Sequence, residues 1–293
     1  MGTIRRRVAL AATIALFASL AACGDDPPDS AEPGGVGSGG DPDSPVLVIG
    51  HEGGFTTPDD AYRTLPDLVV YADGRVVSMG AQIMIYPGPA LPPLFEAQLS
   101  SDGLATVVDA IREAGLTDDA PDYGQPPIAD AGQTVVVVDV DGRRVEHRAE
   151  ALGFDDPSLS AEQREARATL EQFVATARDL DGLVGAELGE ESLFEPDRFR
   201  LWVRADLDDL PAPEPGEPGL REREWTIDAV ELVETRCLAV ADVDAAELFE
   251  LLSDADRLTV FESRGELWSV VARPVLPHEE VCGDDVGSGP AGG

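Results

Sequence analysis

The chain has 293 residues, with 57 acidic side chains against 21 basic ones and a formal net charge of −36 at pH 7. That charge repels nucleic acid phosphates and anionic lipid headgroups, so neither is expected as a direct partner. All basic residues are arginine and lysine is absent from the sequence, which excludes a P-loop, because its lysine contacts the nucleotide phosphates.

The first 22 residues have the pattern of a removable signal peptide. A positive segment, Arg5 to Arg7, precedes an apolar run at 8–20, whose 13 residues fall short of the roughly 20 that a membrane-spanning helix needs. The run ends in Leu-Ala-Ala-Cys at 20–23, which resembles the lipobox of bacterial lipoproteins, where the cysteine is lipidated and becomes the first residue after cleavage. We therefore predict a signal peptide at 1–22 and lipidation of Cys23, with an ordinary secretory signal and an accidental cysteine as the alternative.

The segment after Cys23 is rich in Gly, Pro, Asp, Ser and Ala and has almost nothing to bury. Such a composition predicts a disordered tether at 23–45, which lets a folded body stand away from the membrane. Two acyl chains, such as palmitate, hold a protein stably on a bilayer, whereas one short chain binds only marginally. We expect a lipid anchor in the cell membrane, with the mature chain on its extracytoplasmic face.

Two cysteines, Cys237 and Cys282, remain once Cys23 is assigned to the lipid. An even pair in an oxidising compartment favours a disulfide bond, with two buried free thiols as the alternative. In a chain-entropy treatment, closing a loop of that size stabilises the fold by about 4 kcal/mol. A metal site would need more thiols, or histidines nearby, and the sequence has neither.

Residues 46–182 are predicted to form an N-terminal α+β unit. Two Asp-Gly pairs, at 73–74 and 141–142, lie between β-branched runs, and both turn residues tolerate the positive φ of tight hairpins. Two helices are predicted from apolar residues repeated at helical spacing behind capping serines. In chain order the expected elements are a strand at 45–50, a hairpin of 67–71 with 75–78, an apolar stretch at 94–99, a helix N-capped at Ser101 and ended by Gly115, a hairpin of 134–140 with 144–148, and a helix with a Ser160/Gln163 capping box that ends near 181–182.

Residues 183–282 are predicted to form a C-terminal α+β unit, and the glycine-rich residues 283–293 a disordered tail. Near the boundary, glycine and acidic residues replace the periodic apolar pattern of the preceding helix. The expected elements are strands at 198–204 and 224–227 separated by an exposed proline-rich loop at 211–218, a strand at 235–240, a helix N-capped by Asp244 with Glu247 at the capping-box position, and a hairpin of 258–262 with 267–273.

Both halves therefore show strands, then a capped helix, then a hairpin. This order predicts an α+β fold in which helices pack on one face of antiparallel sheets, and it allows an arrangement as two similar βαββ units. Residue identity between the halves is low, so gene duplication and convergence on a common arrangement both stay open.

Residue types that carry catalysis or metal binding are few and scattered. His51, His147 and His278 lie on three separate segments without HExxH spacing, and no serine lies in a G-x-S-x-G motif. Aspartate doublets in predicted loops are interpreted as solvated charge, with a weak cation site as the alternative. We assign no catalytic residue, cofactor or metal ligand, and leave open whether the protein is an enzyme; a hydrolase built on two converging carboxylates is a third hypothesis.

One predicted loop, at 86–93, has the composition of a binding surface. An aromatic residue followed by prolines makes a stiff, apolar segment with few hydrogen-bond donors, and a partner protein can bind such a segment. We therefore predict Tyr86, Pro87 and Leu91 as candidate partner-binding residues. The alternative is that the loop only connects two strands and covers the core.

Several features together resemble uncharacterised lipoproteins of high-GC actinobacteria. They are the Leu-Ala-Ala-Cys sequence ending at Cys23, the acidic Gly/Pro tether, the absence of lysine, and the run 65–76 that contains Pro-Asp-Leu-Val-Val-Tyr-Ala-Asp-Gly-Arg. The resemblance implies a compartment and a lineage. It implies no activity, and Cys23 is the one residue to which it assigns a role.

The sequence favours a non-enzymatic, membrane-anchored envelope lipoprotein that binds a protein or a cell-wall component. The tether, the expected disulfide and the lack of a catalytic constellation motivate this hypothesis. The second hypothesis is an extracytoplasmic binding protein for a small or lipid-like ligand held between the two halves, which requires a concave apolar cavity at their junction.

Overall fold

A computed structural model describes residues 41–82, 85–205, 207 and 218–283. The predicted signal peptide with Cys23, nearly all of the predicted tether and nearly all of the proline-rich loop and C-terminal tail lie outside these residues. None of the helices in the described part of the chain is long and apolar enough to cross a bilayer.

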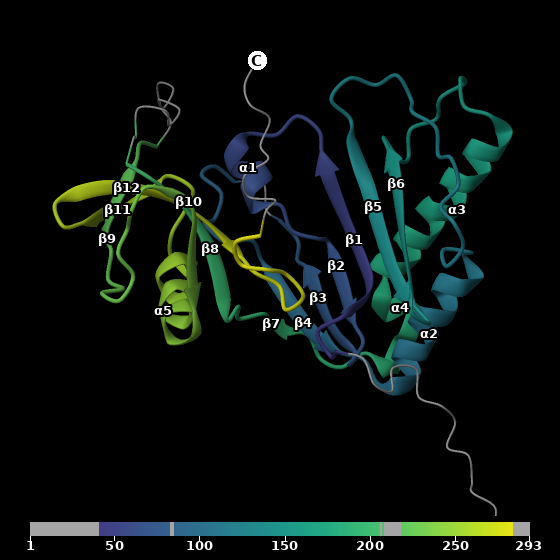
Figure 1. The fold of residues 1–293 in the computed structure, drawn as a ribbon, viewed down its shortest axis with the longest axis horizontal. Helices are drawn as coiled ribbons and strands as arrows, with labels where there is room; N and C mark the ends of the chain where they lie inside the picture. Colours follow the sequence, from purple (N-terminus) through teal and green to yellow (C-terminus); the bar gives the residue numbers. More distant parts are fainter. Residues whose placement is uncertain (1–40, 83–84, 206, 208–217, 284–293) are drawn as a thin grey trace, which may run out of the picture. The chain divides into compact units, whose positions relative to one another are not determined.

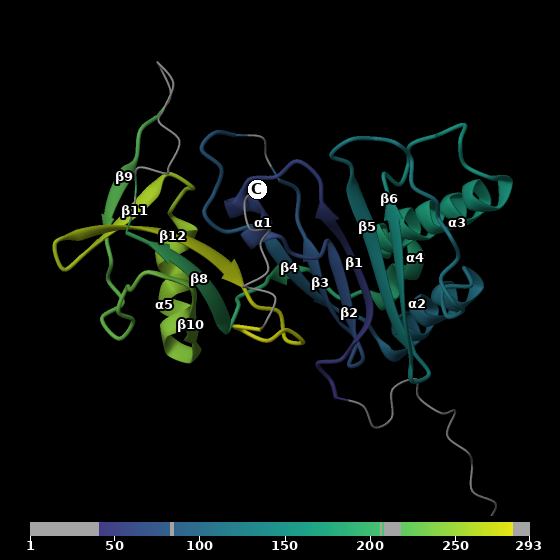
Figure 2. The same ribbon diagram turned by 45° about the horizontal axis from the view of Figure 1, so that its top comes forward.

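Two β-sheets organise the described residues (Figures 1 and 2). The strands of the first sheet are β1 (Pro45–Gly53), β2 (Leu68–Tyr71), β3 (Arg75–Met79), β4 (Leu94–Gln98), β5 (Gly132–Val140), β6 (Arg143–Glu150) and β7 (Ser192–Leu193). Those of the second sheet are β8 (Arg198–Arg204), β9 (Arg221–Glu224), β10 (Thr235–Ala241), β11 (Thr259–Ser263) and β12 (Glu266–Pro274). The helices are α1 (Pro58–Arg63), α2 (Ser101–Glu113), α3 (Ala161–Arg178), α4 (Leu180–Val184), the short 3₁₀ helix η1 (Gly185–Glu187) and α5 (Asp242–Ser253).

The mixture of helices and antiparallel sheets confirms the predicted α+β class. The first sheet has the strand order β6-β5-β1-β2-β3-β4-β7, and neighbouring strands run antiparallel. The second has the order β10-β8-β12-β11-β9, in which β9 runs parallel to β11 and the other pairs are antiparallel.

Both predicted hairpins of the first sheet are confirmed. In the β5–β6 turn, Asp141 and Gly142 both have positive φ, 57° and 74°, as the tight turns that match strand twist require. In the β2–β3 turn, Gly74 has φ of 85°, and a Cβ atom there would lie 2.8 Å from the carbonyl oxygen of Leu99. Glycine at 74 is therefore required by backbone conformation and by space.

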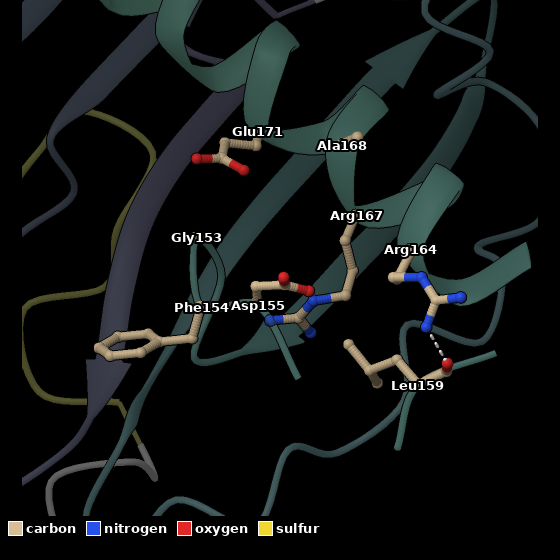
Figure 3. A pocket seen from close by; sticks show the side chains of 8 residues that line it. All are labelled: Gly153, Phe154, Asp155, Leu159, Arg164, Arg167, Ala168 and Glu171. Carbon is tan, nitrogen blue, oxygen red and sulfur yellow. Dashed lines mark hydrogen bonds between the residues drawn. The ribbon is translucent and has the colours of Figure 1, made fainter. Parts of the chain in front are cut away.

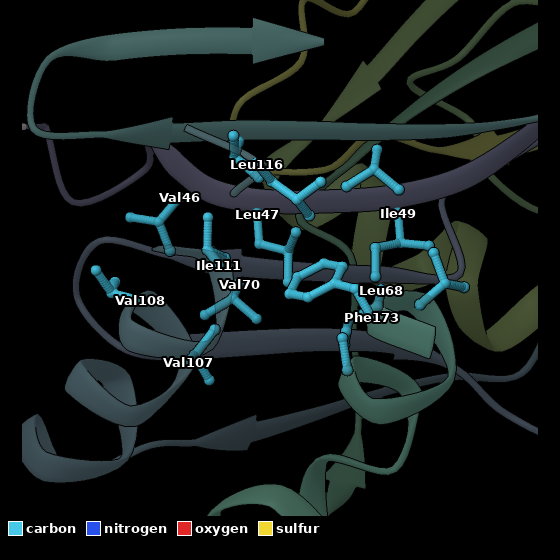
Figure 4. Packing of buried hydrophobic residues seen from close by; sticks show 14 of the residues in the cluster. Val46, Leu47, Ile49, Leu68, Val70, Val107, Val108, Ile111, Leu116 and Phe173 are labelled. Carbon is cyan, nitrogen blue, oxygen red and sulfur yellow. The ribbon is translucent and has the colours of Figure 1, made fainter. Parts of the chain in front are cut away.

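Helices α2 and α3 cover one face of the first sheet and enclose its core (Figures 1 and 4). Figure 4 shows Leu47 of β1 and Val70 of β2 among Val107 and Ile111 of α2 and Phe173 of α3. All five side chains are buried. Burial of an apolar side chain of this size contributes roughly 1.5–3 kcal/mol, so this face supplies a large part of the stabilisation.

The capping prediction for α2 was wrong by one residue. Ser100, and not Ser101, caps the helix, because its Oγ accepts a hydrogen bond from the Gly103 amide at 3.1 Å. The amide of Ser100 also donates to the carbonyl of Glu187 at 2.9 Å. This contact with a distant segment holds Ser100 in the extended conformation of an N-cap, and sequence spacing does not reveal it.

The capping box of α3 is confirmed, but the helix ends earlier than predicted. Ser160 Oγ accepts from the Gln163 amide at 3.1 Å, and the Ser160 amide donates to Gln163 Oε1 at 2.9 Å. The helix ends at Arg178 because Asp179 is the N-cap of α4, where its carboxylate accepts a hydrogen bond from the Gly182 amide at 3.2 Å.

In the second sheet, α5 packs on the face that carries the inward side chains Phe199, Leu201 and Val203 of β8. The predicted cap of this helix was wrong. The helix begins at Asp242, its N-cap is Ala241 without a side-chain bond, and Asp244 lies in the first turn. There its charge favours the helix through the macrodipole.

The predicted strand at 224–227 was also displaced. Strand β9 covers Arg221–Glu224, because these residues pair with Thr259 to Glu262 of β11. Trp225 and Ile227 lie beyond the strand and are buried in the core of the second sheet.

The similar order of elements in the two halves does not produce the same strand order. In the first sheet the leading hairpin strand, β5, lies beside β1, whereas in the second sheet the trailing hairpin strand, β12, lies beside β8. The first sheet also extends past residue 182, where the N-terminal unit was expected to end, because β7 pairs with β4.

Helix α1, which the sequence did not predict, links the two sheets. The ring centroids of Tyr62 on α1 and Trp202 on β8 are 5.8 Å apart, and the Tyr62 hydroxyl donates to the carbonyl of Arg236 on β10 at 3.1 Å. Asp59 forms an ion pair with Arg204 at 2.9 Å. Aromatic and charged side chains therefore fill this contact.

The segment after β12, 275–283, returns to the first sheet. Leu276 is buried with Val69 and Val77 on the face opposite to α2 and α3. His278 Nδ1 lies 2.9 Å from the hydroxyl of Tyr71 on β2. This C-terminal segment therefore joins the second half of the chain to the first.

Candidate functional site

The predicted cysteine pair is brought together. Cys237 on β10 and Cys282 in the C-terminal segment form a disulfide, with their Cα atoms 5.9 Å apart. Cys23 lies outside the described residues, so its predicted lipidation stays a prediction.

The predicted partner-binding loop divides into two parts. Tyr86 is exposed and Pro87 half-buried, but Leu91 is buried in the core of the second sheet beside α5. The Ala90 amide donates to the carbonyl of Ala255 at 3.0 Å. Leu91 is therefore a packing residue that fastens the β3–β4 loop to the second half, and it is not accessible to a partner.

The three histidines do not converge, and two of them have structural roles. His147 is buried; its Nε2 donates to the Leu116 carbonyl at 2.9 Å, so its Nδ1 accepts from the Tyr123 hydroxyl at 2.8 Å. Burial raises the pKa of Tyr123 to about 12. Burial lowers the pKa of His278 and raises the pKa of Tyr71. Their hydrogen bond therefore joins two neutral groups.

His51 belongs to a polar cluster at the end of α3. Its Nδ1 lies 2.8 Å from Asp67 Oδ2 and its Nε2 3.4 Å from Thr134 Oγ1, while Arg178 of α3 donates to the same carboxylate of Asp67. Burial raises the pKa of the Asp67 carboxyl, but the hydrogen bond from His51 and the charge of Arg178 outweigh it and hold the pKa below its usual value.

The order hydroxyl, imidazole, carboxylate is that of a hydrolase triad, but the cluster lacks an accessible nucleophile. Thr134 is only 5% exposed on β5, so its hydroxyl does not reach a substrate carbonyl. Arg178 also neutralises the carboxylate that would have to stabilise an imidazolium ion. We interpret the cluster as an ion-paired anchor between α3 and β1. Within the described residues, no group of three or more potential ligand side chains is placed to hold a metal ion.

Two pockets flank the N-terminal half of α3. One, of about 470 Å³, lies against the loop at 121–125. The other, of about 260 Å³, lies between α3 and the loop after β6, and we call it the α3 pocket (Figure 3). Its lining includes Phe154, Leu159, Arg164, Arg167, Ala168 and Glu171.

Arg167 forms the floor of the α3 pocket. It is 4% exposed, and its guanidinium donates to backbone carbonyls: Nη1 to Tyr123 at 3.2 Å, and Nη2 to Glu150 at 2.9 Å and to Ala151 at 2.5 Å. Burial lowers the pKa of Arg167. Among the described residues, none of the carboxylates forms an ion pair with this buried cation.

Two exposed phenylalanines lie on loops that leave the same end of the first sheet. Gly53 of β1 pairs with Gly132 of β5, and the Gly132 carbonyl accepts from the Ala151 amide just after β6 at 2.9 Å. Phe55 follows the end of β1 and Phe154 follows the end of β6, and their side chains are 93% and 60% exposed. We call this pair the aromatic edge.

Comparison with protein-family models, curated proteins and solved structures finds no match.

Sequence reasoning missed the aromatic edge and Arg167, although each left a signal. Phe55 stands in a loop of glycine and threonine with no periodic apolar partner. Arg167 is three residues before Leu170 and seven before Val174, so it falls on the buried stripe of α3. A charge on such a stripe must find partners inside the protein, which is the signal of a buried arginine.

Proposed function

We propose that the protein is a lipid-anchored recognition protein of the extracytoplasmic membrane face that binds a protein or cell-wall partner. The observation that carries this proposal is the aromatic edge. Single exposed apolar residues are common on protein surfaces, but Phe55 and Phe154 are two of only nine phenylalanines and stand on adjacent loop ends of a strongly acidic chain. Aromatic side chains are enriched among the residues that carry binding energy at interfaces.

The direction of β1 supports this proposal. The strand begins at Pro45, where the chain arrives from Cys23, and ends at Gly53 beside the aromatic edge. Its nine residues span roughly 30 Å at about 3.3 Å per residue. The aromatic edge therefore stands at the end of the first sheet opposite to the entry of the tether. The two described pockets lie beside α3 and not at the junction of the sheets. Binding of a small ligand in the α3 pocket is therefore the second candidate function.

Replacing the lipidation residue tests the anchor. We expect Cys23→Ser to move the protein from the membrane fraction into the medium, because no acyl chain is then attached. Ser30→Ala, in the same predicted tether, is the matched control and should stay with the membranes. Immunoblots of the two fractions measure the distribution, and a Cys23→Ser protein that remains membrane-bound would refute lipid anchoring.

Replacing the aromatic edge tests recognition. A photo-reactive cross-linker on the body is expected to capture a reproducible neighbour in native membranes, and Phe55→Ser with Phe154→Ser should lower that yield at least tenfold. Loss of one interface anchor costs about 2 kcal/mol or more in binding, whereas exposed substitutions change stability by only about 0.5 kcal/mol. Val243→Ser, at an apolar site on α5 that is 69% exposed, is the control. An unchanged yield in the double variant, or no reproducible neighbour of the wild-type chain, overturns the proposal.

A further inference from the structure

The α3 pocket has an arrangement of charge that points to a ligand of its own. We propose that it binds a small zwitterion of the size of an α-amino acid, with the ligand carboxylate at Arg167 and its ammonium group at Glu171. Phe154 of the aromatic edge also lines this pocket, but the proposal rests on Arg167 and Glu171 and stands whether or not that edge binds a partner.

The first step is the unused bonding capacity of Arg167. A guanidinium has five N–H donors, and three hydrogen bonds from Nη1 and Nη2 go to backbone carbonyls. Within the described residues, Nε–H and one Nη1–H of Arg167 have no protein acceptor, and Nε is open to solvent. The carboxylates of Glu171 and Asp156 attract Arg167 through space but form no ion pair with it. Buried charges are normally paired by direct contact with an opposite charge, and a carboxylate in the pocket would supply both an acceptor and that contact.

The second step is the position of Glu171. Residues four apart on a helix lie on the same side, with Cβ atoms about 5–6 Å apart, yet Glu171 and Arg167 do not form an ion pair. The guanidinium turns instead to the carbonyls, and Glu171 extends over Gly153, where a Cβ atom would be 3.5 Å from its Oε1. Glu171 makes neither a hydrogen bond nor an ion pair with the described residues. Figure 3 shows both side chains leaving the same side of α3 toward the loop at 153–155.

The third step is the balance of charge around the pocket. Two arginines, Arg164 and Arg167, and two carboxylates, Asp155 and Glu171, line the pocket. A ligand with one negative and one positive group matches this lining, whereas a phosphate dianion would meet two like charges. Leu159 and Ala168 add apolar contact. A volume of about 260 Å³ lies below the range of pockets for drug-sized ligands, about 300–1,000 Å³, and suits a ligand of amino-acid size.

Isothermal titration of the detergent-solubilised full chain tests the proposal with four probes: L-leucine, N-acetyl-L-leucine, L-leucinamide and inorganic phosphate. We expect leucine to bind at least tenfold more tightly than either blocked analogue, because one charge-assisted hydrogen bond is worth about a factor of ten. Phosphate should not bind. Equal affinity for leucine and N-acetyl-leucine, binding of phosphate, or no leucine binding at about 10 mM overturns the proposal.

Variants locate the binding. Arg167 also supports the surrounding loops, so its replacement tests folding as much as binding. Glu171→Gln should instead lower leucine affinity about tenfold and remove the preference over N-acetyl-leucine. Ala168→Phe, at an exposed helix position, should fill the pocket and abolish binding. Glu165→Gln, exposed elsewhere on α3, is the control, and leucine binding that survives in the Ala168→Phe variant places the site elsewhere and overturns the assignment.

Discussion

Replacing Glu279 with glutamine is expected to lower the free energy of unfolding by about 3 kcal/mol at pH 7, because it leaves a buried arginine without its counter-charge. Arg273 at the end of β12 is 5% exposed. It holds Glu279 in a two-point ion pair, Nη1 to Oε2 at 2.7 Å and Nη2 to Oε1 at 2.6 Å. Glutamine keeps the shape of the side chain but not its charge.

The position of this ion pair explains why its loss should affect the whole chain. Arg273 Nε also donates to the carbonyl of Thr64, the C-cap of α1, at 2.8 Å. Glu279 accepts from the Leu276 amide at 2.9 Å. One pair of charges therefore joins β12, the C-terminal segment and the end of α1.

The effect of Glu279→Gln should depend on pH. Burial raises the pKa of Glu279, but the hydrogen bonds and charge of Arg273 outweigh it and hold the pKa below its usual value. A carboxyl group with a lowered folded-state pKa stabilises the fold above its unfolded-state pKa, about 4.3, and this stabilisation is lost as the pH falls through the folded value. The difference between wild type and variant should thus be full at pH 7 and shrink below about pH 4.

Urea unfolding followed by tryptophan fluorescence and circular dichroism measures this difference. The adjacent exposed residue supplies the control, since Glu280→Gln should change the free energy of unfolding by less than about 0.5 kcal/mol. In an Arg273→Met, Glu279→Gln double variant the loss should be smaller than the sum of the two single losses, because no buried charge is left unpaired. Equal losses for Glu279→Gln and Glu280→Gln would contradict the prediction.

Removal of the disulfide is expected to lower the free energy of unfolding by an amount similar to that for Glu279→Gln. Cys237 and Cys282 are separated by 45 residues, and in a chain-entropy treatment a loop of this length is worth about 4 kcal/mol. The bond ties the C-terminal segment to β10, so its loss frees one end of the segment that carries His278 and Glu279. The native contacts of that segment should persist in folded molecules.

Reduction and mutation give two independent routes to this measurement. The Cys237→Ser, Cys282→Ser double variant and the reduced wild-type chain should show the same lowered urea midpoint, and reductant should not change the variant further. Mass spectrometry after alkylation should detect no modification at Cys237 or Cys282 before reduction and modification at both after it. An identical midpoint for oxidised and reduced wild type would show that the bond does not stabilise the fold.

Elements that depend on neighbouring residues were predictable. The turn at Asp141 and Gly142 follows from the backbone freedom of those two residues, and the capping box of Ser160 and Gln163 satisfies amides within one helical turn. Elements that depend on distant partners were not predictable. Strand β9 reads Arg-Glu-Arg-Glu without apolar alternation, and it forms because β11 offers a parallel partner.

The candidate sites follow the same division. The Cys237–Cys282 pair was predictable from the even number of cysteines left after Cys23 and from the predicted oxidising compartment. The burial of Leu91 depends on the core of the second half, which the composition of its loop does not indicate. Helix α1 was missed although Thr57 caps it and Pro58 opens it, because six residues are too few for a periodic apolar pattern.

The sequence by itself determined the α+β class, the hairpins and the two long amphipathic helices of the first half, because these arise from hydrogen bonds and apolar periodicity within short stretches. Only the tertiary structure decided the strand orders, the linkage of the sheets through α1 and the C-terminal segment, and the meeting of Arg167 with the carbonyls of Tyr123, Glu150 and Ala151. Those features are set by contacts between residues far apart in the chain. Their energies depend on which faces meet, and local pattern does not specify that.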